Sequence, residues 1–147
     1  MSREYPEHPL CGVGVVVWRG DRLLLIRRAR PPREGQWSLP GGLQELGETV
    51  FETAEREVRE ETGLSVAATE LIDVVDLIER DGGGRVRRHY TLIDVTAEWR
   101  AGEVSPSDEV AEAQWFTLDA IPAPQLWQET VRIVRLSAER RSRRRRR

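Results

Sequence analysis

The sequence predicts an α+β fold, an α/β/α sandwich in which a mixed β-sheet lies between helices. Three observations lead to this prediction. Apolar, β-branched segments occur in pairs around short Gly-containing turns, which is typical of β-hairpins. One central segment has apolar residues at helical spacing, and a second amphipathic segment lies near the end of the chain. With 147 residues and no internal repeat, the chain has the length of one ordinary domain.

The first predicted element is a buried β-hairpin. Its strands cover residues 11–18 and 22–28, and Gly20 and Asp21 between them form a tight-turn signal. Residues 29–36 contain two prolines and a glycine, so we expect a loop there.

The clearest predicted helix lies just before the middle of the chain. Thr49 is a suitable N-cap, and Glu52 three residues later completes a capping box. Gly63 follows the last turn as a C-terminal stop. The helix is therefore expected between Thr49 and Gly63.

The second half of the chain is expected to complete the sheet and add a helix. Residues 65–79 and 86–99 form a predicted long hairpin around the turn 81–84. Residues 113–116 are expected to form a short strand, and residues 125–140 a terminal amphipathic helix. These elements suffice for two helix layers and one sheet.

The basic residues are distributed unevenly along the chain. All 23 are arginines, against 25 acids and a formal net charge of −2, and seven of them lie in residues 140–147. We therefore expect a single domain over residues 1–139, with a disordered Arg-rich tail over 140–147. An acidic domain argues against nucleic acid as a general partner, so any nucleic-acid binding is expected to depend on the tail.

Targeting signals are also informative. The N-terminal residues are polar and contain no apolar core, and no apolar run approaches the length of a membrane span. A single cysteine, Cys11, excludes an internal disulfide. These features predict a cytoplasmic protein that does not use a membrane.

The predicted central helix carries three carboxylates on one face. Glu57, Glu60 and Glu61 stand at positions i, i+3 and i+4, so their like charges repel unless a positive group lies among them. A hard divalent cation that prefers oxygen ligands fits this set, Mg²⁺ first and Mn²⁺ second. A solvated acidic helix face is the alternative for an isolated pattern of this kind.

The residues around these glutamates match a known motif. The pattern G-x5-E-x7-R-E-U-x-E-E-x-G-U, where U is aliphatic, is complete over residues 42–64, and nine residues fill its fixed and aliphatic positions: Gly42, Glu48, Arg56, Glu57, Val58, Glu60, Glu61, Gly63 and Leu64. In this motif the chain resembles the Nudix hydrolase family, and residues 35–42 and 107–122 look like the family's flanking segments.

The resemblance implies a metal-dependent pyrophosphohydrolase. In the implied reaction, water attacks a phosphorus of a nucleoside diphosphate that is linked to another group. The implied fold is the α/β/α sandwich of the family. The resemblance further implies that Glu57, Glu60 and Glu61 ligate metal together with the carbonyl of Gly41. Glu57 is the first choice for the base that activates water, and Glu109 the second.

A neighbouring pair is assigned a different role. In the family it is a structural ion pair, which here implies Glu48 and Arg56, tying the loop that begins at Gly42 to the helix. Replacing either residue would loosen the ligand geometry without removing a ligand.

Substrate binding is predicted from two regions. Arg28, Arg30 and Arg33 flank the loop before the motif and could face phosphate. Residues around Trp127 resemble the segment of Nudix enzymes that hydrolyse oxidised purine nucleotides, which implies a base stacked on Trp127 and read by Glu129. A tryptophan packed on the sheet is the alternative.

The identity of the substrate stays open at this point. An ADP-ribose-like nucleotide sugar and a modified nucleoside triphosphate both fit the predicted class. The alternatives are a catalytically silent Nudix-fold binding or regulatory module and an RNA 5′-end pyrophosphohydrolase that uses the arginine tail. The expected partner is a small nucleotide, and the sequence is also compatible with a homodimer.

Overall fold

A computed structural model describes residues 3–30, 33–105 and 107–146 of the chain. Its centre is a mixed sheet of seven strands, in the order β3-β2-β1-β6-β5, with β4 paired to β1 and β7 paired to β2. Strands β1 and β6 are parallel and all other pairs are antiparallel. The strands are β1 (Leu10–Arg19), β2 (Arg22–Arg28), β3 (Trp37–Ser38), β4 (Gly41–Leu43), β5 (Ser65–Arg80), β6 (Val86–Ala101) and β7 (Val110–Thr117).

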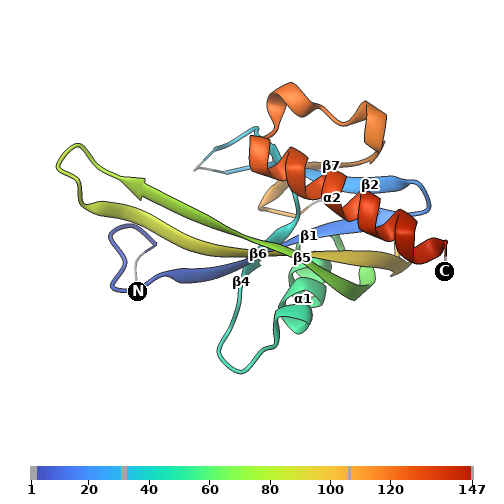
Figure 1. Ribbon diagram of the computed structural model, residues 1–147, viewed down its shortest axis with the longest axis horizontal. Helices are drawn as coiled ribbons and strands as arrows, with labels where there is room; N and C mark the ends of the chain where they lie inside the picture. Colours follow the sequence, from blue (N-terminus) through green and yellow to red (C-terminus); the bar gives the residue numbers. More distant parts are fainter. Residues whose placement is uncertain (1–2, 31–32, 106, 147) are drawn as a thin grey trace.

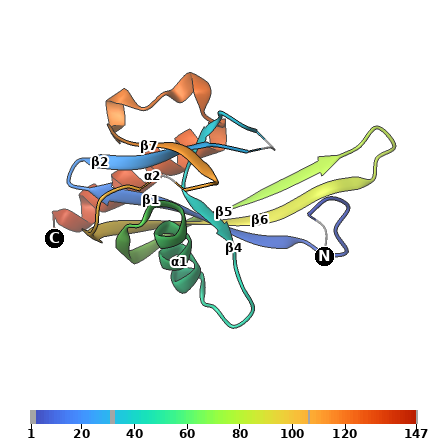
Figure 2. The same cartoon turned by 180° about the vertical axis from the view of Figure 1, so that it is seen from behind.

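Two helices cover opposite faces of this sheet. Helix α2 (Gln128–Arg145) lies in front of the sheet in Figure 1, and α1 (Val50–Thr62) comes to the front in the reverse view of Figure 2. Short 3-10 turns at Leu118–Ala120 and Ala123–Gln125 connect β7 to α2. The predicted α+β sandwich with a mixed sheet between helices is confirmed.

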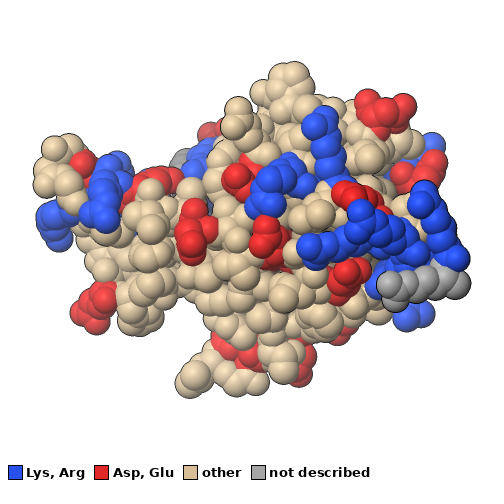
Figure 3. Space-filling view, viewed as in Figure 1, with Lys and Arg blue, Asp and Glu red and all other residues tan. Residues whose placement is uncertain are grey.

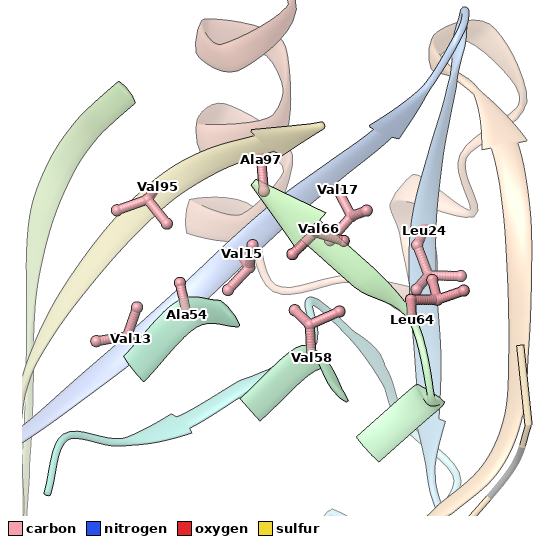
Figure 4. Packing of buried hydrophobic residues seen from close by; sticks show 10 residues of the cluster. All are labelled: Val13, Val15, Val17, Leu24, Ala54, Val58, Leu64, Val66, Val95 and Ala97. Carbon is pink, nitrogen blue, oxygen red and sulfur yellow. The ribbon is translucent and has the colours of Figure 1, made fainter. Parts of the chain in front are cut away.

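Strand β1 supplies the core on both faces. Val13, Val15 and Val17 point towards α1, where they pack with residues of β2, β5, β6 and the helix, as Figure 4 shows. Val16 and Trp18 point the other way and pack with the cluster under α2. Because both faces are covered, the strand is apolar without a break rather than alternating. Within the described residues, no helix is long and apolar enough to cross a membrane.

The ends of α1 form as its sequence predicts. The Thr49 hydroxyl accepts a hydrogen bond from the backbone N–H of Glu52, and the Glu52 carboxylate accepts one from the N–H of Thr49. Gly63 ends the helix in the left-handed conformation, with φ 81°. These caps fix which residues of the helix face the sheet.

Strands β5 and β6 extend past the rest of the sheet as a long arm, which is clear in both ribbon views (Figures 1 and 2). The N-terminal segment lies beside it. The Tyr5 hydroxyl donates to Asp81 in the turn of the arm, and Glu4 forms ion pairs with Arg87 and Arg88. The start of the chain is therefore attached to the arm.

The end of the chain differs from the sequence prediction. Residues 140–145 continue α2 instead of forming a disordered tail, while Arg147 lies outside the described residues. Arg141 is 7% exposed and donates two hydrogen bonds to Glu98 of β6, at 2.6 and 2.9 Å. Arg140 donates to the backbone carbonyls of β5. Long-range partners, which local composition does not reveal, therefore hold this part of the run as helix.

Figure 3 shows the consequence on the surface, where arginines gather over the C-terminal end of α2. Acidic side chains lie among them, because Arg143 pairs with Glu139 and Arg144 lies near Glu70 and Glu98. Much of the positive charge at this end is thus balanced within the domain.

The Arg141–Glu98 pair leads to a first prediction. Arg141→Ala leaves the Glu98 carboxylate without its bidentate partner, so we expect a loss of about 2 kcal/mol in the free energy of unfolding. Urea denaturation followed by circular dichroism measures it. Arg143→Ala removes an exposed i,i+4 pair of the same helix and is expected to cost less than about 0.5 kcal/mol. Equal, small losses in the two variants would contradict this account of the helix end.

Candidate active site

The acidic face of α1 lies where the helix meets β4. Glu61 is buried, at 7% exposure, whereas the side chains of Glu57 and Glu60 are 16% and 57% exposed. The three carboxylates therefore grade from the interior to the surface along little more than one helical turn. The three carboxylates therefore differ in their access to solvent although all three residues are glutamates.

Glu61 is held by the backbone of β4. The Gly41 N–H donates to Glu61 Oε1 at 2.7 Å. Burial, with a smaller contribution from the negative charges of Glu57 and Glu109, raises the pKa of the Glu61 carboxyl to about 8 despite this hydrogen bond. The position favours a neutral carboxyl until a positive charge arrives.

Glu57 lies against a glycine that cannot be enlarged without moving it. A Cβ at Gly42 would come within 2.4 to 2.6 Å of the Glu57 carboxyl atoms. Burial raises the pKa of Glu57, while Arg56 acts in the opposite direction by donating from Nη1 to Glu57 Oε1 at 2.9 Å. The absence of a side chain at Gly42 therefore determines where the Glu57 carboxyl lies.

Arg56 joins the acidic face to the preceding loop. Its Nε and Nη2 donate to the two carboxylate oxygens of Glu48, at 2.5 and 2.9 Å, and its Nη1 also reaches Glu60 Oε2 at 3.1 Å. The guanidinium and a backbone N–H together lower the pKa of Glu48 to about 2. Thr53 donates a further hydrogen bond to Glu48. Arg56 Nη1 also lies 3.8 Å from Glu45 Oε1, so one guanidinium offsets part of the charge of four carboxylates.

This arrangement bears on how a cation would fit. In the part of the chain that the structure describes, no three Asp, Glu, His or Cys side chains are already gathered around one point as a metal site. The side chains are nevertheless suitable, because α1 carries carboxylate oxygens at three adjacent positions and buries one of them in an unfavourable negative potential. Arg56 contacts only Oε1 of Glu57 and Oε2 of Glu60, so the other oxygen of each carboxylate could serve a cation.

Two further predicted residues are near this face. Glu109 is exposed in the loop before β7, and its charge raises the pKa of both Glu57 and Glu61. Arg28, at the end of β2, lies close enough that its charge lowers the pKa of Glu61. The loop before β7 therefore brings one negative charge close to the three glutamates, and the end of β2 brings one positive charge.

The remaining predicted binding residues lie elsewhere. Arg30 is exposed in the loop after β2, and Arg33 forms an ion pair with Glu79 of the arm. Trp127 is the N-cap of α2 and packs on the cluster beneath that helix, across the sheet from α1. Glu129 pairs with Arg132 of the same helix. Trp127 and Glu129 therefore lie on the α2 side of the sheet, opposite the three glutamates.

Comparison with known proteins identifies the family. A sequence profile of the NUDIX domain matches residues 9–136. The chain belongs to the Nudix family. The complete motif recognised in the sequence is therefore that of a Nudix domain, whose members generally use divalent metal ions.

Individual Nudix relatives support the same family. The chain is 36% identical over 115 residues to an ADP-ribose pyrophosphatase of Methanocaldococcus jannaschii, and the match covers 78% of this chain and 66% of the relative. It is 40% identical over 111 residues to an NAD-capped RNA hydrolase of Pseudomonas aeruginosa, covering 74% of this chain and 36% of the relative. It thus spans slightly less than two thirds of the first relative and about a third of the second.

A solved structure shares the whole Nudix fold. A MutT Nudix hydrolase from Burkholderia pseudomallei is 34% identical and superposes with a TM-score of 0.72, covering 88% of this chain and 98% of the other. The sheet and both helix layers are therefore a familiar arrangement.

The contact between Gly42 and Glu57 leads to a second prediction. Gly42→Ala forces the Glu57 carboxyl to move, so we expect Mn²⁺ to bind about tenfold more weakly, measured by isothermal titration calorimetry. Gly82→Ala is the matched control, because a Cβ there has no neighbour within 4 Å and its φ lies outside the left-handed region. Equal Mn²⁺ affinities for both variants and the parent would refute the proposed role of Gly42.

The raised pKa of Glu61 leads to a third prediction, for the metal-free protein. A carboxyl whose folded-state pKa is about 8 and whose unfolded value is 4.5 binds more protons when folded, so its contribution to stability is lost as pH rises between these values. Glu61→Gln removes this loss, and we expect the variant to gain up to about 4 kcal/mol on the parent between pH 5 and pH 8.5. Urea unfolding in EDTA measures it.

Glu139→Gln, an exposed glutamate of α2, serves as the control for Glu61→Gln. It should follow the pH dependence of the parent. If Glu61→Gln does so too, Glu61 is ionised throughout this pH range and the burial argument is wrong.

Proposed function

We propose that the chain is a metal-dependent pyrophosphohydrolase that cleaves nucleoside diphosphates linked to another group. The observation that carries the proposal is the acidic face of α1, where a complete Nudix motif supplies Glu57, Glu60 and Glu61 beside Gly41. A purely structural helix has no need of a buried, repelled carboxyl such as Glu61. The names of the relatives support the same class.

Mg²⁺ is the proposed metal, with Mn²⁺ as a substitute, because three carboxylates and a backbone carbonyl form an all-oxygen donor set. Glu57, Glu60, Glu61 and the Gly41 carbonyl would hold it. When bound, it supplies positive charge that stabilises the negative charge developing on the pyrophosphate oxygens. Arg28 provides a second positive charge near Glu61, suited to a phosphate oxygen.

Glu57 is proposed to accept a proton from the attacking water. Its carboxyl is half-buried next to Gly42, and the Arg56 hydrogen bond favours its ionised form, as a general base requires. Glu109 is the second choice, because its exposed carboxylate is within electrostatic range of both Glu57 and Glu61. Glu48 and Arg56 position Glu57 and do not react themselves.

The proposed substrate class is a nucleotide sugar of the ADP-ribose type, with modified nucleoside triphosphates as the next class. The similarity to an ADP-ribose pyrophosphatase over 78% of this chain supports the first. An RNA 5′ end is less well supported, because Arg141, Arg143 and Arg144 at the end of α2 pair with Glu98, Glu139 and Glu70. A cytoplasmic location and a homodimer are further proposals from the sequence.

A substrate panel tests this function and provides the fourth prediction. With Mg²⁺ present, phosphate or nucleotide release is measured from ADP-ribose, dinucleoside polyphosphates, ordinary and oxidised nucleoside triphosphates and 5′-triphosphorylated RNA. We expect turnover of ADP-ribose that EDTA abolishes and Mg²⁺ restores. Glu61→Gln should lower kcat at least about 100-fold, and the control Glu139→Gln should not.

Release from none of these compounds would favour the silent binding module instead. Full activity of Glu61→Gln would mean that the metal ligands are wrongly assigned.

A further inference from the structure

A second buried carboxyl lies on the opposite face of the sheet. The side chains of Asp94, Thr96 and Glu98 on β6 form one row that faces α2. Thr96 hydrogen-bonds to Ser137 and Glu98 to Arg141, so two members of the row have partners on the helix. Asp94 is 8% exposed, and no hydrogen bond or ion pair among the described residues involves its carboxyl group.

A mostly buried carboxyl without a protein partner is unfavourable, although its oxygens are not fully enclosed, since no enclosed side-chain oxygen among the described residues lacks a hydrogen bond. Burial, together with the charges of Asp73 and Glu129 and against the opposing charge of Arg132, raises the pKa of Asp94 to about 7. A threonine that hydrogen-bonds to α2, as Thr96 does, or an apolar residue would make the folded state more stable than an aspartate does.

The surroundings keep space for the Asp94 carboxyl. A Cβ at Gly14 of β1 would meet Asp94 Oδ1 at 2.4 Å and the Leu39 side chain at 3.7 Å. Gly41 packs on the same stretch of β1, where its own Cβ would come within 3.0 Å of the Gly14 Cα. The glycine backbone of Gly14 thus separates Asp94 from the strand that holds Glu61.

The register between β6 and α2 places Asp94 near the start of the helix. Thr96 pairs with Ser137 and Glu98 with Arg141, two strand residues for four helix residues, so Asp94 lies beneath the first two turns. This agrees with the influence of Glu129 and Arg132 on its pKa. Trp127, the N-cap residue, is at the start of these two turns and packs on the apolar cluster under α2.

We propose that Asp94 is a specificity residue that accepts a hydrogen bond from the exocyclic amino group of the substrate's nucleobase, with Trp127 against the face of the base. The inference rests on the proposed function, because the base belongs to the nucleotide whose diphosphate is cleaved at the acidic face of α1. An apolar, aromatic wall with one unpartnered acceptor suits a flat ring that carries N–H donors. A ligand amino group supplies the partner that the fold does not.

Two variants and paired substrates test the proposal. Asp94→Asn replaces one acceptor oxygen with a donor, and Asp94→Ala removes both oxygens. Each is assayed with Mg²⁺ on ADP-ribose and GDP-ribose and on their analogues with hydrogen in place of the exocyclic amino group. Asp76→Asn, an exposed acid of β5, is the matched control. Unfolding in urea verifies that every variant is folded.

We expect both Asp94 variants to lower kcat/KM for the preferred amino-bearing substrate at least about tenfold, mainly through KM. Their kcat/KM for its amino-free analogue should stay within about twofold of the parent, a selectivity that a merely structural role would not produce. Unchanged values, or equal losses on both members of a pair, would overturn the proposal.

A binding measurement separates this inference from the proposed function. AMP and GMP are titrated in EDTA while the tryptophan indole signals are followed by NMR. Binding by the parent and by Asp76→Asn, weakened at least about tenfold in Asp94→Ala, supports a base site even if the parent hydrolyses nothing. Absence of binding by the parent, or equal binding by Asp94→Ala, overturns the inference even if turnover is confirmed.

Discussion

The close packing of α1 on a stretch of β4 without side chains is the constraint on which the acidic site depends. Gly41 offers its N–H to Glu61, and Gly42 leaves room for the Glu57 carboxyl. Any larger residue at either position would meet backbone or carboxylate atoms at less than 3 Å. The two glycines therefore set both the depth at which the glutamates lie and the charge state that each of them favours.

The local parts of this structure were predictable from the sequence because short-range rules decide them. The capping box at Thr49, the glycine end of α1 and the first hairpin turn depend on neighbours within a few residues. The shared face of Glu57 and Glu61 follows from helical spacing alone. The Nudix motif added the residues around these glutamates, Gly42, Glu48 and Arg56, which the helical spacing of apolar residues could not identify.

Long-range contacts account for what the sequence analysis missed. The helical state of residues 140–145 depends on Glu98, more than forty positions away, so composition suggested disorder instead. Trp127 was predicted to stack on a base, and which face of the sheet it would lie on depends on α2, which places it opposite α1. Whether an aspartate within a strand finds a partner depends on the helix packed over it, which no local pattern around Asp94 reveals.

The contacts of Arg56 have a consequence for how the protein is assembled. A guanidinium is always charged, so this residue acts as a built-in counter-ion that lets α1 fold with its acids adjacent before any metal ion arrives. In zinc fingers, by contrast, the metal and the fold form together. The proposed cation would therefore enter a helix face whose repulsion Arg56 already offsets in part, so we expect the domain to fold without the ion and to take it up afterwards.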